Sequence, residues 1–375
     1  MATATATATK ERRKTGSGGI TSSVGDLLDA LQDVMRAVPN HGPKPVLTNV
    51  RIGNGLITGT DLEVMIDRHI DGDCEPFLVP AARLLQILRA CPRTAEVTLT
   101  PSASRVTVQA GGGRWELPTE DVNEFPAWEV TGAKPIARLP SDQFARAVRA
   151  TEYACDADSS RYALGCVLVE VKDGNPTFIA TDGRRLTAVE TETDQAVDDS
   201  TTQVPARAIR LMAGFAHNSE TGVQLEATAS EVVCSVDRGT ITARLIEGKF
   251  SKWRDVFPER DVEATVVDVV ELASATRAAS VCTSEQSKGV EFTFSESGIR
   301  LRSQSAEAGQ AEVTCDVITA GKPAVVKLDP RFVLDFLGGL STDDEPHVEI
   351  EADKPGDAVL LRCGDVRGII MPLAE

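Results

Sequence analysis

A short pattern of proline followed by arginine recurs along the chain at a constant spacing. It occurs three times, in the segments Leu78–Arg83, Gln203–Arg207 and Lys327–Arg331. The prolines Pro80, Pro205 and Pro330 are 125 residues apart, and three times 125 is the chain length of 375. Each proline follows a β-prone segment and precedes an apolar helical run, and proline suits the first turn of a helix, where its missing N–H needs no partner. The spacing therefore predicts three copies of one unit.

Each unit carries a second helical segment upstream of its proline, and short alternating segments surround both helices. Helices are predicted at Asp26–Val38, Pro80–Arg93, Ser141–Cys155 and Asp268–Cys282, and after Pro205 and Pro330. Strands are predicted at Val46–Ile52, Gly55–Thr60, Glu96–Thr100, Arg105–Ala110, Cys166–Val171, Thr177–Ala180, Glu231–Val236, Thr240–Ile246, Val290–Phe294, Gly298–Arg302 and His347–Glu351. This predicts an α+β fold of three tandem domains, residues 20–133, 134–257 and 258–375, after a disordered cationic tail at 1–19.

The chain is acidic, yet its helices carry arginine on one side. Lys+Arg 39 against Asp+Glu 56 gives a net charge of −17, which argues against nucleic-acid binding through bulk charge. Along Pro80–Arg93, Leu84 and Leu88 share one face while Arg83 and Arg89 lie opposite. A solvated surface is the ordinary explanation for such arginines. Their segregation onto helices favours a surface that follows duplex DNA loosely, and we assign that role to Arg83, Arg89, Arg146, Arg149, Arg207 and Arg210.

Other classes of protein are disfavoured by the residues present. The eight cysteines are never closer than the eleven positions that separate Cys155 from Cys166, and the four histidines are scattered, so neither a metal nor a cofactor is expected. Asp61 and Asp182 each follow threonine, but the sequence has no P-loop, GxSxG or dinucleotide fingerprint, so catalysis is not expected. The first residues have no apolar core of a secretory signal. A cytoplasmic protein without a membrane segment is expected, with an organelle transit peptide as the alternative reading of the tail.

A set of motifs in a fixed order resembles one known family, the beta subunit of bacterial DNA polymerase III, or sliding clamp. Ala180–Leu186 (ATDGRRL) resembles its ATDGHRLA signature, and Gly59–Glu63 (GTDLE) resembles its TGTDLE element. The other matches are Leu78–Arg83, Arg161–Leu164, Gly248–Pro258 and Met371–Leu373. The resemblance covers residues 20 to 375.

The resemblance implies a non-catalytic processivity factor. Two chains would join head to tail into a ring with helices lining the hole and sheets outside, around duplex DNA of any sequence. A clamp loader would open the ring. The DNA polymerase III alpha subunit, translesion polymerases and repair proteins would dock through short peptides rich in Leu and Phe. The alternative is a divergent clamp-fold interaction scaffold with restricted partners.

The resemblance also implies site residues. The partner-peptide pocket would contain Leu164, Thr181, Gly183, Arg184, Leu186, Val256, Ile369, Met371, Pro372 and Leu373. The dimer interface would contain Trp115, Leu117 and Val281, and Lys44 would reach DNA in the hole. Arg184 replaces the family's usual histidine, Ser251 its proline and Asp255 a basic residue, and the chain ends in Ala374-Glu375 instead of a basic tail. These departures leave the partner preference open.

Overall fold

The computed structural model describes residues 18–41, 44–156, 164–193, 197–284, 289–342 and 345–373. These residues form six α-helices and 24 strands, in three blocks with the same order of elements. Every block reads strand, helix, four strands, helix, three strands, which is a β-α-β-β-β half-unit used twice. The predicted α+β fold with three repeated units is therefore confirmed, and the structure resolves each unit into two copies of a smaller one. The chain forms two compact units, which divide after Glu129, and residues 238–241 belong to the first.

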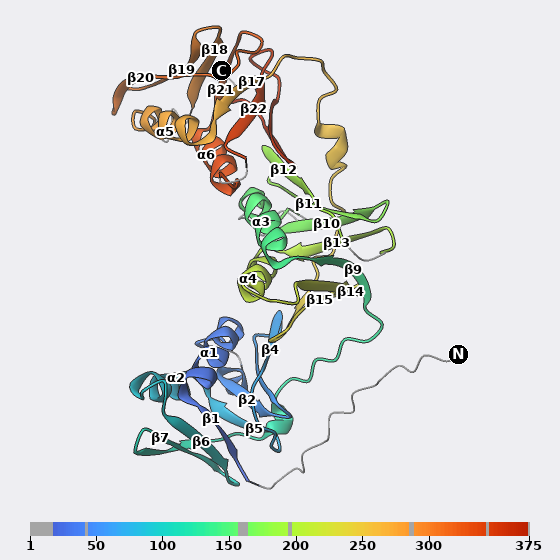
Figure 1. The fold of residues 1–375 in the computed structure, drawn as a ribbon, viewed down its shortest axis with the longest axis vertical. Helices are drawn as coiled ribbons and strands as arrows, with labels where there is room; N and C mark the ends of the chain where they lie inside the picture. The colour runs from blue at the N-terminus through green and yellow to red at the C-terminus, as the bar shows by residue number, and fades with distance from the viewer. Residues whose placement is uncertain are drawn as a thin grey trace, which may run out of the picture. The chain divides into compact units, whose positions relative to one another are not determined.

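The first block contains one antiparallel four-stranded sheet, in the order β1-β6-β7-β8, and four strands that are neighbours in a larger sheet, in the order β5-β2-β3-β4. Its helices α1 and α2 pack against each other (Figure 1). Helix α1 starts where the Ser23 hydroxyl accepts a hydrogen bond from Asp26 N at 3.0 Å, a standard N-cap. The elements are β1 Ile20–Ser23, α1 Val24–Val34, η1 Met35–Ala37, η2 Pro45–Thr48, β2 Asn49–Gly53, β3 Leu56–Thr60, β4 Val64–His69, β5 Phe77–Pro80, α2 Ala81–Ala90, β6 Glu96–Pro101, β7 Arg105–Ala110, β8 Gly113–Pro118 and η3 Val122–Glu124.

The second block repeats this arrangement, with α3 packed on α4. Strands β13-β10-β11-β12 lie in one sheet, and β9-β14-β15 are neighbours in another. The elements are β9 Lys134–Leu139, α3 Ser141–Thr151, η4 Glu152–Ala154, β10 Cys166–Lys172, β11 Asn175–Thr181, β12 Arg185–Glu190, β13 Ser200–Pro205, α4 Ala206–Ala216, β14 Val223–Ala227, β15 Glu231–Val236, β16 Gly239–Arg244 and η5 Trp253–Val256.

The third block shares a sheet with the second. Strand β12 pairs antiparallel with β24, which gives one eight-stranded sheet in the order β13-β10-β11-β12-β24-β23-β22-β17. The other sheet of this block has the order β20-β19-β18-β21. The elements are β17 Thr265–Asp268, α5 Val269–Ser280, β18 Val290–Ser295, β19 Gly298–Ser305, β20 Gly309–Cys315, β21 Ala324–Leu328, α6 Pro330–Gly339, β22 His347–Glu351, β23 Val359–Cys363 and β24 Val366–Ile370.

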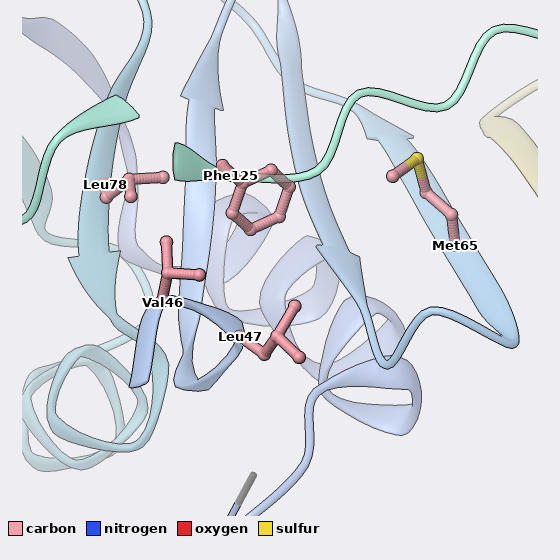
Figure 2. Close-up of a cluster of buried hydrophobic side chains, with 5 residues drawn as sticks. All are labelled: Val46, Leu47, Met65, Leu78 and Phe125. Atoms are coloured by element: carbon pink, nitrogen blue, oxygen red, sulfur yellow. The ribbon is translucent and has the colours of Figure 1, made fainter. Parts of the chain in front are cut away.

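Linker residues complete the core on one face of the sheets. In the first unit, Phe125 is 6% exposed and belongs to a buried cluster with Val46, Leu47, Met65 and Leu78 (Figure 2). Burial of a phenylalanine side chain contributes about 1.5–3 kcal/mol. In the second block, Trp253 of the corresponding linker packs with four sheet residues in the same manner. The linkers are thus part of the fold.

Three details of the sequence-based prediction were wrong. Only Pro330 occupies the first helical turn, whereas Pro80 and Pro205 end strands and sit at the N-cap. Val46–Ile52 is not one strand, because residues 45–48 form η2, where Pro45 has no N–H for a strand partner. The Thr48 hydroxyl closes this turn on Pro45 O at 2.8 Å. The helices predicted to end at Val38 and Cys155 change to short 3₁₀ turns after Val34 and Thr151.

Candidate functional site

The turn between β11 and β12 is held by its own side chains. The Thr181 hydroxyl donates to Arg185 O at 2.6 Å and accepts from Gly183 N at 3.1 Å. Asp182 Oδ1 accepts from the backbone N–H groups of Arg184 and Arg185 at 2.9 and 3.0 Å. Gly183 has a φ of +84°, a left-handed conformation that glycine adopts without steric cost. Thr181 and Asp182 therefore shape this turn, and the Thr181 hydroxyl makes its hydrogen bonds within it.

The first block contains the same turn with one informative change. Thr60 donates to Val64 O and accepts from Leu62 N, while Asp61 Oδ1 accepts from Glu63 N and Val64 N. The residue at the glycine position is Leu62, with a φ of +78°. A non-glycine residue in this conformation costs about 1–2 kcal/mol. The same turn thus occurs in both blocks. Of these two copies, the one at Gly183 has no side chain over its backbone, whereas the other carries the Leu62 side chain.

The predicted pocket residues converge where β12 meets β24. Leu186 lies opposite Ile369 in the ladder, and Met371 N donates to Arg184 O at 2.8 Å just beyond it. Leu186 and Ile369 are buried, whereas Met371 is 41% exposed. Leu373 N donates to Lys327 O at 2.8 Å, so the end of the chain joins β12 to β21.

Val256 reaches the same region on η5. It is 43% exposed, and Trp253 of the same short helix packs in one cluster with Leu186. Leu164 lies before β10, half-buried, and Pro372 is half-buried beside Met371. Met371 and Val256 are thus exposed apolar side chains, one beside the buried pair Leu186 and Ile369 and the other on the short helix whose Trp253 packs with Leu186.

Helix α6 adds residues that the sequence analysis missed. The guanidinium groups of Arg184 and Arg185 lie 5.0 and 4.5 Å from the ring centroid of Phe332. Phe332 directly follows the third proline–arginine pattern, but the pattern could not show which element its ring would meet. At the start of α6, burial by itself would raise the pKa of Asp329, but hydrogen bonds from Arg331 outweigh burial and the pKa lies below its usual value.

The residues that depart from the family pattern lie beside a second depression. Ser251 and Asp255 are exposed and border a cavity of about 430 Å³ under residues 248–255. Glu170 lines this cavity, where it accepts a hydrogen bond from Trp253 Nε1 at 3.2 Å and forms an ion pair with Arg254. The Ala374-Glu375 end lies outside the described residues.

The helix arginines differ in what they contact. Arg83, Arg89, Arg149 and Arg207 are exposed, as is Lys44 at the start of η2. Arg146 is instead a bidentate partner of Asp365, with Nη1 2.9 Å from Oδ1. Arg210 pairs with Glu152. The guanidinium of Arg146 thus joins the second and third blocks, and Arg210 is also engaged within the chain, so the assignment of both to DNA contact stays a prediction.

The predicted interface residues of the first domain face its core. Trp115 and Leu117 lie on β8, opposite the buried Val108 and Val106 of β7. Leu117 is 9% exposed and therefore serves the domain interior, while Trp115 is half-buried at the edge. Val281, which directly follows α5, is 74% exposed.

The described part of the chain contains no group of three or more His, Cys, Asp or Glu side chains that could hold a metal ion. None of its helices combines the length and apolar character that crossing a membrane requires.

Known proteins share this architecture. Models of the DNA polymerase III beta subunit match the chain in order, the N-terminal domain at residues 20–129, the central domain at 138–252 and the C-terminal domain at 254–369. The beta sliding clamp of Pseudomonas putida is 26% identical over 358 residues, covering 92% of this chain and 97% of the relative. The clamp of Haemophilus influenzae is 25% identical, covering 84% and 88%.

Solved structures agree in fold. The beta subunit of Pseudomonas aeruginosa has a TM-score of 0.88 at 24% identity, covering 95% of this chain and all of that one. A Caulobacter crescentus beta sliding clamp, solved with polyethylene glycol at a putative beta-motif tethering region, has a TM-score of 0.86 at 25% identity, covering 96% and 99%. The chain belongs to the DNA polymerase III beta subunit family, the beta sliding clamps.

Proposed function

We propose that two copies of this chain close head to tail into a ring around duplex DNA and tether partner proteins there, without chemistry of their own. The supporting observation is the pairing of β12 with β24. Each is the last strand of a β-α-β-β-β half-unit, and their pairing joins two four-stranded sheets into one of eight strands.

Two equivalent strands have no partner of this kind. β8 and β20 also end half-units, and each is the edge of a four-stranded sheet in the described chain. An unpaired edge presents a row of free backbone groups that favours pairing with another chain. Pairing β8 of one copy with β20 of the other would repeat the β12–β24 arrangement, and Val281 would lie near the new contact. We keep Trp115 as an edge residue of this interface.

The DNA contacts are proposed for the exposed cations Lys44, Arg83, Arg89, Arg149 and Arg207. Because the protein is acidic and makes few phosphate contacts, the ring is expected to slide along DNA instead of binding it tightly. The peptide pocket is proposed at Leu186, Val256, Ile369 and Met371, with Leu164, Gly183, Arg184, Pro372 and Leu373 around it and Thr181 shaping its turn. The domain limits 20–133, 134–257 and 258–375 remain part of the proposal.

Two measurements test this proposal, the mass of the protein in solution and its retention on circular DNA. Light scattering after size exclusion should give about 80 kDa, twice the 40.0 kDa chain. After loading onto nicked circular DNA, the protein should stay bound and should be released when the circle is cut. Retention on the linear product would contradict encirclement and favour a scaffold that contacts DNA or its partners directly.

The peptide pocket has a separate test. A synthetic nine-residue peptide containing Leu and Phe should bind the chain in a fluorescence polarisation assay. Removing residues 371–375 deletes an exposed apolar side chain and two backbone hydrogen bonds, so binding should be lost while the dimer persists. Unchanged peptide affinity would remove Met371, Pro372 and Leu373 from the pocket.

A further inference from the structure

The side chain of Arg185 is fixed by three acceptors from different elements. Its Nε donates to Asp182 Oδ2 at 3.1 Å, its Nη1 to Asp335 Oδ2 at 2.5 Å and its Nη2 to Tyr153 O at 2.6 Å. The side chain is 11% exposed. Arg185 thus connects the β11–β12 turn, the end of the α3 region and helix α6, and its charge is used within the chain.

Aromatic rings complete this arrangement. The Arg185 guanidinium lies 4.5 Å from the ring centroid of Phe332 and 5.2 Å from that of Tyr153. The Tyr153 hydroxyl is 2.6 Å from Thr187 Oγ1 on β12. A guanidinium at this distance from an aromatic ring is attracted by the ring quadrupole, and more strongly in a partly desolvated site.

The backbone of Arg185 lies in the turn that borders the pocket. Its N–H binds Asp182 and its C=O binds Thr181, and in the ladder it lies opposite Ile370. The preceding carbonyl, Arg184 O, receives Met371 N. A shift of the Arg185 side chain would therefore move the turn and the attachment of the C-terminal segment together.

We propose that Asp335 and Phe332 of α6 are positioning residues of the partner pocket, which they hold in its binding shape through Arg185. This inference rests on the proposed function of the pocket. Asp335 supplies the carboxylate that orients the guanidinium, and Phe332 supplies the ring against which Arg184 and Arg185 lie.

The experiment uses full-length protein and the Leu/Phe peptide described above. Asp335→Asn should weaken peptide binding about tenfold, and Asp335→Glu, which keeps the carboxylate, should return the affinity to within about threefold of the wild type. Phe332→Leu keeps apolar volume but removes the ring, and should weaken binding several-fold. Amide exchange at residues 182–186 should become faster in Asp335→Asn and in Phe332→Leu.

Asp365→Asn is the matched control, because it breaks the Arg146 ion pair at the same block junction without touching the turn. It should leave the peptide affinity within about twofold and exchange at 182–186 unchanged. Normal affinity and normal exchange in Asp335→Asn would overturn the inference while the proposed pocket stands. A wild-type chain that fails to bind the peptide would overturn the pocket itself, and the exchange data would still decide whether Asp335 holds the turn.

Discussion

The clearest disagreement between charge pattern and structure concerns Arg146, and it gives a quantitative prediction. Arg146 and Asp365 form a bidentate pair, with side chains 29% and 28% exposed. Exposed pairs contribute about 0.2–1 kcal/mol, whereas hydrogen bonds to charged groups contribute about 1.5–3 kcal/mol. For this partly buried pair we expect about 1–2 kcal/mol. At about 2–4 °C per kcal/mol for 150–250 residues, Arg146→Gln should lower the Tm by about 2–8 °C.

The assay is thermal unfolding by circular dichroism, combined with fluorescence polarisation of a labelled linear duplex at low salt. Arg149→Gln is the control, since Arg149 lies exposed on the same helix. It should leave the Tm nearly unchanged and weaken binding to the linear duplex, which depends on phosphate contacts and not on encirclement. A cycle with Asp365→Asn should give a coupling free energy of about 1–2 kcal/mol. An unchanged Tm in Arg146→Gln, with duplex binding weakened as much as in Arg149→Gln, would refute the reasoning and support Arg146 as a DNA contact.

Three further outcomes are expected. Burial raises the pKa of Asp67 despite a hydrogen bond from Thr58, so its contribution to stability is present at low pH and is lost as pH rises through the raised value. Asp67→Asn should therefore stabilise the protein at pH 7 more than at pH 3, and denaturant titrations with an equal gain at both pH values would contradict this. Burial also raises the pKa of the Cys166 and Cys234 thiols to about 12, so both should resist iodoacetamide at pH 8 until the chain unfolds, as mass spectrometry would show. Val281→Asp places a charge on a side chain that is 74% exposed in the single chain. It should convert the dimer to monomer in sedimentation velocity without changing the Tm of the monomer fold. A dimer that survives would remove Val281 from the interface.

Much of the predicted fold rested on local sequence patterns. Proline before a helix, acidic N-caps such as Asp268, and the Thr-Asp-Gly turn act within a few residues. Such features are visible in the sequence, and among them the proline spacing predicted the three units, while helical periodicity predicted the second helix of each. The smaller β-α-β-β-β repeat escaped notice, because a hydrogen-bonded ladder needs only alternating side chains and leaves their identities free.

The sequence alone determined that this chain repeats one α+β unit three times, because capping and turn chemistry depend on neighbouring residues. Only the tertiary structure decided that β12 pairs with β24, that Arg185 meets Phe332, and that Arg146 binds Asp365 across a separation of 219 residues. The helical periodicity placed Arg146 and Arg149 on the same polar face, and nothing local distinguished them. The difference arises because a charged side chain takes the partner that the packed domains bring within reach, and that partner is set by the fold as a whole.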